Sequence, residues 1–239
     1  MPRPYRRIIP SPWLRPWRII TIIFILIVIY QLWIFAHIWW WKTANPSASA
    51  FMRDRLSAMQ TISPNAKLHH QWAPYAKISK HLRRAIIASE DAKFVDHEGF
   101  DWEGIQYAYE KNIKNGKIVA GGSTISQQLA KNLFLSTRRT PWRKLEEAAI
   151  TLMLEATLDK RRIFEIYLNV IEWGNGVFGA EAAAQHYFHT SASNLSVSQA
   201  ARLAAMIPNP RYYDKHRKAK GLLRKSEIIL RRMNSAEVP

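Results

Sequence analysis

The chain has 239 residues, which is enough for one domain of ordinary size plus an appendage and too short for two full domains. Hydrophobic residues make up 48% of the chain, which excludes disorder as its main state, and the absence of cysteine excludes disulfides, thiol nucleophiles and Cys-ligated zinc. The 35 Lys and Arg residues exceed the 18 Asp and Glu residues to give a formal net charge of +17, so an anionic partner is expected.

The first forty residues predict a membrane anchor. Residues 19–36 contain no charged side chain, and the apolar run continues to Trp41, which matches the roughly 20 residues that a helix needs to cross a bilayer core. Five arginines precede the run and only Lys42 follows it before Arg53, so the positive-inside rule places the N-terminus in the cytoplasm. We predict a basic cytoplasmic tail over residues 1–18, a transmembrane helix over 19–41, a linker over 42–55 and one domain over 56–239.

Two alternatives compete for this segment. A cleavable signal peptide would use the small residues at positions 48–50 as its cleavage site, but the apolar run is long for such a peptide and Trp39–Trp41 lie in between. A buried helix of a soluble protein would not be apolar on every face. Outside the cytoplasm, the remaining charge of +12 suits anionic lipid head groups or pyrophosphates, and nucleic acid is not expected as a partner.

The rest of the chain predicts a single, mainly α domain whose core lies downstream of a short linker at residues 45–49. Residues 50–80 are mixed, because Pro64 and Pro74 break any long helix, and apolar residues then recur at helical spacing over 78–90. Strand patterns are nearly absent. Glycines, prolines and capping residues bound further predicted helices over residues 101–112, 124–135, 142–158, 161–169, 181–187, 197–206 and 217–234, with Pro208 and Pro210 ending the one over 197–206.

An acidic segment follows the predicted helix over 78–90. Glu90 ends that helix, and a carboxylate at the end of an apolar helix can lie in a dry cleft, where it suits general acid or base chemistry. The simpler interpretation is a solvated carboxylate at a helix end. His97, which lies among carboxylates, is either a metal ligand or a hydrogen-bonded structural histidine.

The sequence over residues 121–132 reads GGSTISQQLAKN. If Ser123 or Thr124 caps a helix here, Ile125, Leu129 and Leu133 form its apolar face. Its polar face is then formed by Thr124, Gln127, Gln128 and Lys131. The glycines and the helix N-terminus could bind a phosphate or a sugar, although an ordinary capped amphipathic helix has the same pattern.

Two further segments are charged. Arg138, Arg139, Arg143 and Lys144 cluster closely enough to bind a polyanion, while Glu146 or Glu147 could simply pair with a cation on the same helix. Glu165 lies within the predicted helix over 161–169, where it could brace a basic residue of the site.

Together and in this order, these segments resemble the peptidoglycan glycosyltransferase family (glycosyltransferase family 51) over roughly residues 60–215. The family patterns E-D-x-x-F-x-x-H-x-G, G-G-S-T-[IL]-[ST]-Q-Q-L-x-K-N, R-K-x-x-E and R-I-x-E-x-Y-x-N are matched at 90–99, 121–132, 143–147 and 162–169. No S-x-x-K, S-D-N or K-T-G set of transpeptidase motifs accompanies them, so transpeptidase activity is not expected.

The resemblance implies a lysozyme-like helical fold with a small membrane-proximal lobe. It also implies that lipid II, an undecaprenyl-pyrophosphate-linked disaccharide-pentapeptide, is polymerised into linear glycan strands by an inverting transfer that releases undecaprenyl pyrophosphate. Glu90 is implied as the general base and Glu147 as a second acid that orients cations or holds a divalent ion. Mg²⁺ or Mn²⁺ helps some members, and the sequence leaves the cofactor open. The implied substrate-binding residues are Asp91, Phe94, His97, Ser123, Thr124, Gln128, Lys131, Asn132, Arg138, Arg143, Lys144 and Glu165.

The implied partners are lipid II, the growing glycan chain and membrane lipids, with other cell-wall synthesis or division proteins left open. The implied location is the inner membrane, crossed once, with the catalytic domain in the periplasm. Two other functions remain as alternatives. A lysozyme-like muramidase that cuts glycan would have no pyrophosphate to stabilise and no use for the cations, and an inactive cell-wall scaffold would not need intact motif positions.

Overall fold

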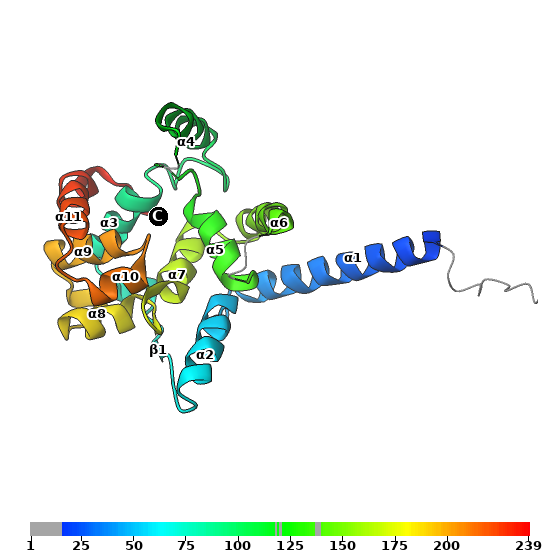
Figure 1. Cartoon of the computed structure of the whole chain (residues 1–239), viewed down its shortest axis with the longest axis horizontal. Helices are drawn as coiled ribbons and strands as arrows, with labels where there is room; N and C mark the ends of the chain where they lie inside the picture. Colours follow the sequence, from blue (N-terminus) through cyan, green and yellow to red (C-terminus); the bar gives the residue numbers. More distant parts are fainter. Residues whose placement is uncertain (1–15, 118, 120, 137–139) are drawn as a thin grey trace, which may run out of the picture.

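The computed structural model describes residues 16–117, 119, 121–136 and 140–239. A long helix, α1 (Pro16–Trp40), projects from a body of shorter helices, as Figure 1 shows. The helices of the body are α2 (Ala50–Ile62), α3 (Lys80–Glu90), α4 (Trp102–Asn115), α5 (Ile125–Phe134), α6 (Pro141–Thr157), α7 (Lys160–Val170), α8 (Ala180–Phe188), α9 (Val197–Met206), α10 (Pro210–Lys215) and α11 (Lys220–Arg232). Short 3₁₀ turns lie at Tyr75–Lys77, Ala192–Asn194 and Met233–Ser235.

One small sheet accompanies the helices in the described part of the chain. Its strands are β1 (His69–His70), β2 (Glu172–Gly174) and β3 (Val177–Phe178), in the order β1-β3-β2. β1 runs parallel to β3, and β2 pairs antiparallel to it with a shift of register between Glu172 and Gly174. The sheet therefore joins the segment before α3 to the segment after α7, and the predicted mainly α architecture is confirmed.

The core lies where α5 packs against α6 and α7, and where α3 packs against α9 and α11. Helical periodicity explains which faces meet: Ile125, Leu129 and Leu133 of α5 are buried, as predicted. α7 buries almost all of its second half. The largest fully buried side chains include Trp173, Tyr167, Phe94, Phe164 and Phe178.

Two stretches differ from the sequence-based prediction. α2 occupies part of the range predicted as linker and mixed structure; Ser49 caps it, and the hydroxyl of Ser49 accepts a hydrogen bond from the Met52 amide at 3.1 Å. Only Ala50 and Met52 of α2 are buried, so the helix has too short an apolar stripe for periodicity to reveal it. Pro210 was predicted to end a helix, but it begins α10, because proline suits the first helical turn.

The apolar N-terminal helix meets the length and composition needed to span a membrane over Trp17–Trp40, with a mean hydropathy of 2.7. Its last turns belong to the body: Ile34 and Ile38 are fully buried, and the Trp41 ring lies 5.3 Å from the Phe134 ring of α5. The expectation that the whole core lies downstream of residues 45–49 is therefore wrong. The three buried residues come from the anchor itself.

The connection after α1 is also held by hydrogen bonds. Arg162 of α7 donates to the Trp41 carbonyl oxygen at 2.8 Å, to the Ala44 carbonyl oxygen at 2.5 Å and to Asn45 Oδ1 at 2.9 Å. Glu165 accepts a hydrogen bond from Arg162 at 2.7 Å and from the Tyr75 amide at 2.9 Å. Glu165 therefore braces a basic residue, as predicted, but that residue is Arg162, which holds the segment after α1 and is not one of the predicted site residues.

Candidate active site

Glu90 is the last residue of α3. Leu82, Ile86 and Ile87 of this helix are fully buried in the core, so the helix axis and its final carboxylate are fixed in place. The Glu90 side chain is 11% exposed, which favours the interpretation of a carboxylate in a cleft over that of a solvated carboxylate at a helix end. Its Oε1 accepts a hydrogen bond from Ser89 Oγ at 3.0 Å, and its Oε2 accepts one from Gln128 Nε2 at 3.2 Å.

Gln128 of α5 is itself oriented by Tyr167 of α7. The Tyr167 hydroxyl donates to Gln128 Oε1 at 2.9 Å. Burial, reinforced by the charges of Glu90 and Asp91, raises the pKa of Tyr167 well above its ordinary value, so the hydroxyl stays protonated and acts as a donor. Because the amide oxygen is taken by this hydroxyl, the amide nitrogen of Gln128 faces Glu90.

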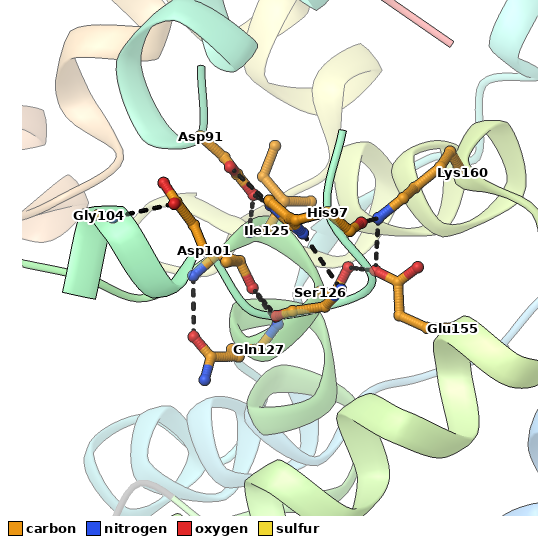
Figure 2. Close-up of polar contacts among 11 residues, drawn as sticks. Asp91, His97, Asp101, Gly104, Ile125, Ser126, Gln127, Glu155 and Lys160 are labelled. Atoms are coloured by element: carbon orange, nitrogen blue, oxygen red, sulfur yellow. Dashed lines mark hydrogen bonds and ion pairs between the residues drawn. The ribbon is translucent and has the colours of Figure 1, made fainter. Parts of the chain in front are cut away.

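Asp91 joins the end of α3 to the start of α5, as Figure 2 shows. Its Oδ2 accepts a hydrogen bond from the Ile125 amide at 2.9 Å, where a carboxylate at a helix N-terminus is favourable. His97 Nε2 donates to Asp91 Oδ1 at 3.0 Å, and the Gly99 amide donates to His97 Nδ1 at 3.1 Å. Of the two interpretations of His97, the hydrogen-bonded structural histidine is the one that this geometry supports.

The first turn of α5 is closed by a capping box. Thr124 Oγ1 accepts from the Gln127 amide at 3.2 Å and donates to the Gly99 carbonyl oxygen at 2.7 Å, while Gln127 Oε1 accepts from the Thr124 amide at 3.0 Å. Gly99 has φ +90°, and a Cβ there would lie 2.8 Å from Thr151 Cγ2, so only glycine fits. Gln127 was predicted to lie on the polar face of the helix, but it is buried in this cap together with Thr124.

A buried polar network that the sequence analysis missed supports the same loop. Ser126 donates to the Glu155 carboxylate, and Lys160 Nζ binds Glu155 Oε1 at 2.8 Å and also the His97 carbonyl oxygen (Figure 2). The sequence did contain a sign of this network. Ser126 lies on the apolar face of α5 and Glu155 lies within the apolar helix α6, and a buried polar side chain needs a hydrogen-bond partner.

Two openings flank the contact between Glu90 and Gln128. One, of about 170 Å³, is lined by Glu90 and Asp91 at the end of α3, by Asp101 and by the loop 121–124, including Ser123. The other, of about 210 Å³, is lined by Gln128, Lys131 and Asn132 of α5, together with α2 and the segment 207–211. Asn132 is mostly buried, and its Nδ2 donates to the Gln128 carbonyl oxygen at 2.7 Å.

Cations gather one helical turn beyond Gln128. Lys131 is half-buried; burial lowers its pKa from the ordinary value of 10.5, nearby Arg143 and Lys144 lower it further, and Glu147 and Glu90 act against them. Glu147 is buried and pairs with Lys144, and its Oε2 lies 3.7 Å from Arg143 Nη1. Among these four described residues, three cations thus lie near one carboxylate, and their summed charge is +2.

The predicted site residues fall into three groups. Glu90, Ser123, Gln128, Lys131 and Asn132 line the openings, and Arg143, Lys144 and Glu147 lie with Lys131. Asp91 and Thr124 also line the first opening, but they and His97 have their polar atoms engaged within the protein. The fully buried Phe94 and the bracing Glu165 are supports as well. Arg138 lies outside the described residues.

Within residues 16–117, 119, 121–136 and 140–239, no group of three His, Asp or Glu side chains could hold a metal ion. Glu147, the carboxylate that the sequence analysis assigned to this possibility, is paired with Lys144 and Arg143. The residues that the structure describes therefore do not form a ready ligand set.

Comparison with known proteins decides the family. A family model described as transglycosylase matches residues 56–234. The chain belongs to the transglycosylase family. It is 73% identical over 223 residues to the biosynthetic peptidoglycan transglycosylase of Methylobacillus flagellatus, covering 93% of this chain and 97% of that protein. It is 68% identical over 212 residues to the protein of the same name from Chromobacterium violaceum, covering 89% and 93%.

This membership fixes the class of the protein. The chain is a glycosyltransferase that polymerises peptidoglycan glycan strands, and its helical domain is lysozyme-like. Synthesis of glycan is thereby favoured over the muramidase and scaffold alternatives. One N-terminal apolar helix is consistent with a single-pass membrane anchor.

Proposed function

We propose that this transglycosylase polymerises lipid II and releases undecaprenyl pyrophosphate. The observation that carries the proposal lies on α5. Gln128 binds Glu90, and Lys131, one turn away, lies with Arg143 and Lys144. One face of α5 thus contacts a proton acceptor on α3 and, one turn further on, lies beside the cations of α6 that could bind a departing pyrophosphate. Glycosyl transfer from a pyrophosphate needs both groups.

Glu90 is proposed as the general base. It takes the proton from the 4-hydroxyl of the acceptor's N-acetylglucosamine, and the oxygen attacks C1 of the donor's N-acetylmuramic acid. The bond from C1 to the pyrophosphate oxygen breaks, and its electron pair leaves with undecaprenyl pyrophosphate. Displacement from the opposite face converts the α-linkage into a β-linkage, and the proton ends on Glu90.

Lys131, Arg143 and Lys144 are proposed to stabilise the leaving pyrophosphate. Their summed charge, after Glu147 is counted, is +2, which opposes the two negative charges of the bound pyrophosphate diester and the further one that develops on the leaving oxygen as the C1–O bond breaks. Lys131 bears its charge in a half-buried position, where an anion is attracted more strongly than in water. Arg138 is proposed to join this cluster from the sequence alone.

Ser123 and Asn132 are proposed to bind sugar oxygens, since each lines one of the two openings. Asp91, His97 and Thr124 act by holding the loop 121–124 and the start of α5 beside Glu90. They are therefore proposed as supports of the site, in place of the direct substrate contacts that the resemblance implied.

We propose that α1 crosses the inner membrane once, with residues 1–18 in the cytoplasm and the catalytic domain in the periplasm. The asymmetry of arginines supports this orientation. Lipid II is confined to a membrane, so an enzyme whose anchor packs against α5 and α6 holds its cleft close to the substrate.

A divalent ion is not assigned to the protein in this proposal. The described cations supply the positive charge at the pyrophosphate, and any Mg²⁺ or Mn²⁺ would act by binding the substrate's phosphates together with Glu147. Polymerisation rates measured in EDTA, in Mg²⁺ and in Mn²⁺ distinguish stabilisation of the pyrophosphate by the protein's cations alone from stabilisation that also needs a metal ion. Polymerisation that persists in EDTA supports the cations alone, and polymerisation that stops contradicts them.

The proposal as a whole is tested with purified full-length protein and labelled lipid II in detergent. We expect long glycan strands that muramidase digests to β-linked disaccharides, and undecaprenyl pyrophosphate released once per disaccharide added. Shortening of preformed glycan without consumption of lipid II would contradict the proposal and indicate a hydrolase.

A further inference from the structure

Lys225 lies on α11 and reaches the carboxylate of Glu90. The two residues are 135 positions apart in the sequence, and Lys225 belongs to none of the four matched motif segments. Its Nζ lies 3.4 Å from Glu90 Oε1, and its side chain is 32% exposed. α11 packs on α3 and α9, on the side of α3 away from α5 (Figure 1).

The other partners of Glu90 show what Lys225 adds. Ser89 Oγ donates to Oε1 and Gln128 Nε2 donates to Oε2, so neutral donors hold both oxygens. Lys225 supplies the positive charge that directly contacts the carboxylate. A charge-assisted contact of this kind favours the ionised carboxylate and restricts its rotation.

The other charged groups near Glu90 make this contact important. Asp91 follows Glu90 directly, and a neighbouring negative charge favours protonation of a carboxylate. Lys131 of α5 is a nearby cation, but under the proposed function its charge is used by the pyrophosphate. Tyr167 of α7 stays neutral. Lys225 lies on α11, which carries none of the cations proposed to bind the pyrophosphate, so its charge stays available to Glu90.

We propose that Lys225 is a positioning residue for Glu90, which keeps the carboxylate ionised and correctly oriented while the anionic donor is bound. The inference rests on the proposed role of Glu90. It also gives α11, the C-terminal helix, a part in catalysis that its sequence did not indicate.

The test replaces Lys225 with Met and with Arg in the full-length protein. Arg224, which precedes it on α11 and is exposed, is replaced with Met as a matched control for charge and helix. For Lys225→Met we expect kcat on lipid II to fall about tenfold while KM changes less than about twofold, and Lys225→Arg to recover most of the rate. Melting temperatures of all variants should match the wild type, because the side chain is partly exposed.

A second expectation concerns pH. Removing a cation that lies 3.4 Å from a carboxylate oxygen favours the protonated form, so the acidic limb of the rate profile should move to higher pH in Lys225→Met. Arg224→Met should not move it. The ¹³C signal of the Glu90 carboxyl, assigned by its loss in Glu90→Gln, should titrate with the same displacement without substrate present.

Several outcomes would overturn the inference. One is an unchanged kcat and pH profile in Lys225→Met, and another is an equal loss in Arg224→Met. A rise in KM at constant kcat would assign Lys225 to substrate binding instead. The ¹³C titration needs no turnover, so it tests Lys225 even if the wild type fails to use lipid II, a result that would contradict the proposed function alone.

Discussion

The two ends of the cleft are built in different ways. At the Glu90 end, buried hydrogen bonds fix almost every polar group, from Asp91 and His97 to the cap at Thr124. At the cation end, the Lys144 side chain is 55% exposed and that of Arg143 is 21% exposed, and they share Glu147 with Lys131. The hydrogen bonds at the Glu90 end hold its polar groups in one orientation, whereas the cation end keeps positive charge that no carboxylate among the described residues neutralises.

This difference follows from what each end must do in the proposed reaction. A general base works only if its oxygen is within hydrogen-bond reach of one hydroxyl, so it needs rigid support. A leaving pyrophosphate needs charge more than geometry, because it moves away as the bond breaks. Substitutions at the two ends should therefore differ in how they affect activity and stability.

Glu90→Gln should have the largest effect. The amide cannot accept the proton, so we expect polymerisation to fall at least about a hundredfold, with an unchanged melting temperature because the side chain keeps its shape. Glu110→Gln on α4, an exposed carboxylate, is the control and should retain full activity. A folded Glu90→Gln protein that elongates glycan at more than a few per cent of the wild-type rate would remove Glu90 from the role of base.

Lys131→Ala should cause the next largest loss of activity, without a loss of stability. Loss of one cation at the developing charge should cost about 2–4 kcal/mol in kcat/KM on lipid II. The pKa of Lys131 is lowered, chiefly by burial, so the folded state disfavours its charged form and stability from this group increases as pH rises. The melting temperature at neutral pH should therefore stay the same or rise. Lys114→Ala, an exposed lysine of α4, should change kcat/KM less than about twofold, and a change that small in Lys131→Ala would contradict the assignment.

The pH dependence of Lys131→Arg sharpens the same point. Because its pKa lies below the ordinary 10.5, Lys131 loses its charge below that value, and kcat/KM should begin to decline on the alkaline side before pH 10.5. A guanidinium stays charged throughout this range, so the alkaline limb should move to higher pH in Lys131→Arg. An alkaline limb that stays in place would indicate that another group titrates there.

Thr124→Val should show the opposite behaviour, with stability affected first. Valine keeps the shape but loses the hydrogen bonds to the Gly99 carbonyl oxygen and the Gln127 amide, at a cost of about 1–3 kcal/mol. For a domain of this size that lowers the melting temperature by roughly 2–10 °C, with a smaller loss of activity through the loop 121–124. Thr124→Ser keeps the hydroxyl and should behave as wild type. If Thr124→Val melts normally but fails to bind lipid II, Thr124 contacts substrate as the resemblance implied.

The sequence predicted the helices that form the cleft better than it predicted the environment of individual polar side chains. Helical periodicity and caps located α3, α5, α6 and α9, because local hydrophobic spacing determines them. Periodicity also predicted the apolar face of α5 correctly. It did not predict that Gln127, on the polar face, is buried in the capping box. A capping box and an open ligand-binding face both require polar residues at the same positions, so spacing alone cannot separate them.

What the sequence missed depends on contacts between distant segments. Lys225 reaches Glu90 across 135 residues, Glu155 reaches Ser126 across 29, and Arg162 reaches the carbonyl oxygens after α1 across more than 100. None of these pairs has a fixed spacing along the chain. The end of the anchor was missed for a related reason: a helix that is apolar all round gives no sign of which turns meet lipid and which meet protein.

The smallest effect is expected when the anchor is shortened without touching the body. Deletion of residues 1–32 keeps Ile34, Ile38 and Trp41, so kcat/KM in detergent should stay within about twofold of the full-length protein. Activity on lipid II in bilayers should fall, because the anchor no longer concentrates the enzyme at the membrane. Deletion of residues 1–44 removes those three buried side chains, each contributing roughly 1.5–3 kcal/mol, as well as backbone acceptors of Arg162.

The longer deletion should therefore lower the melting temperature and weaken the cation end of the cleft, against which the anchor packs through Phe134 of α5 and through α6. In detergent no bilayer is present, so α1 cannot raise activity by concentrating the enzyme at a membrane. A difference between the two deletions there therefore reports how far the buried turns of α1 stabilise the catalytic body. If deletion of residues 1–32 already abolishes activity in detergent, the outer turns of α1 contribute to substrate binding. If both deletions melt and turn over like the full-length protein, the buried turns of α1 do not stabilise the catalytic body.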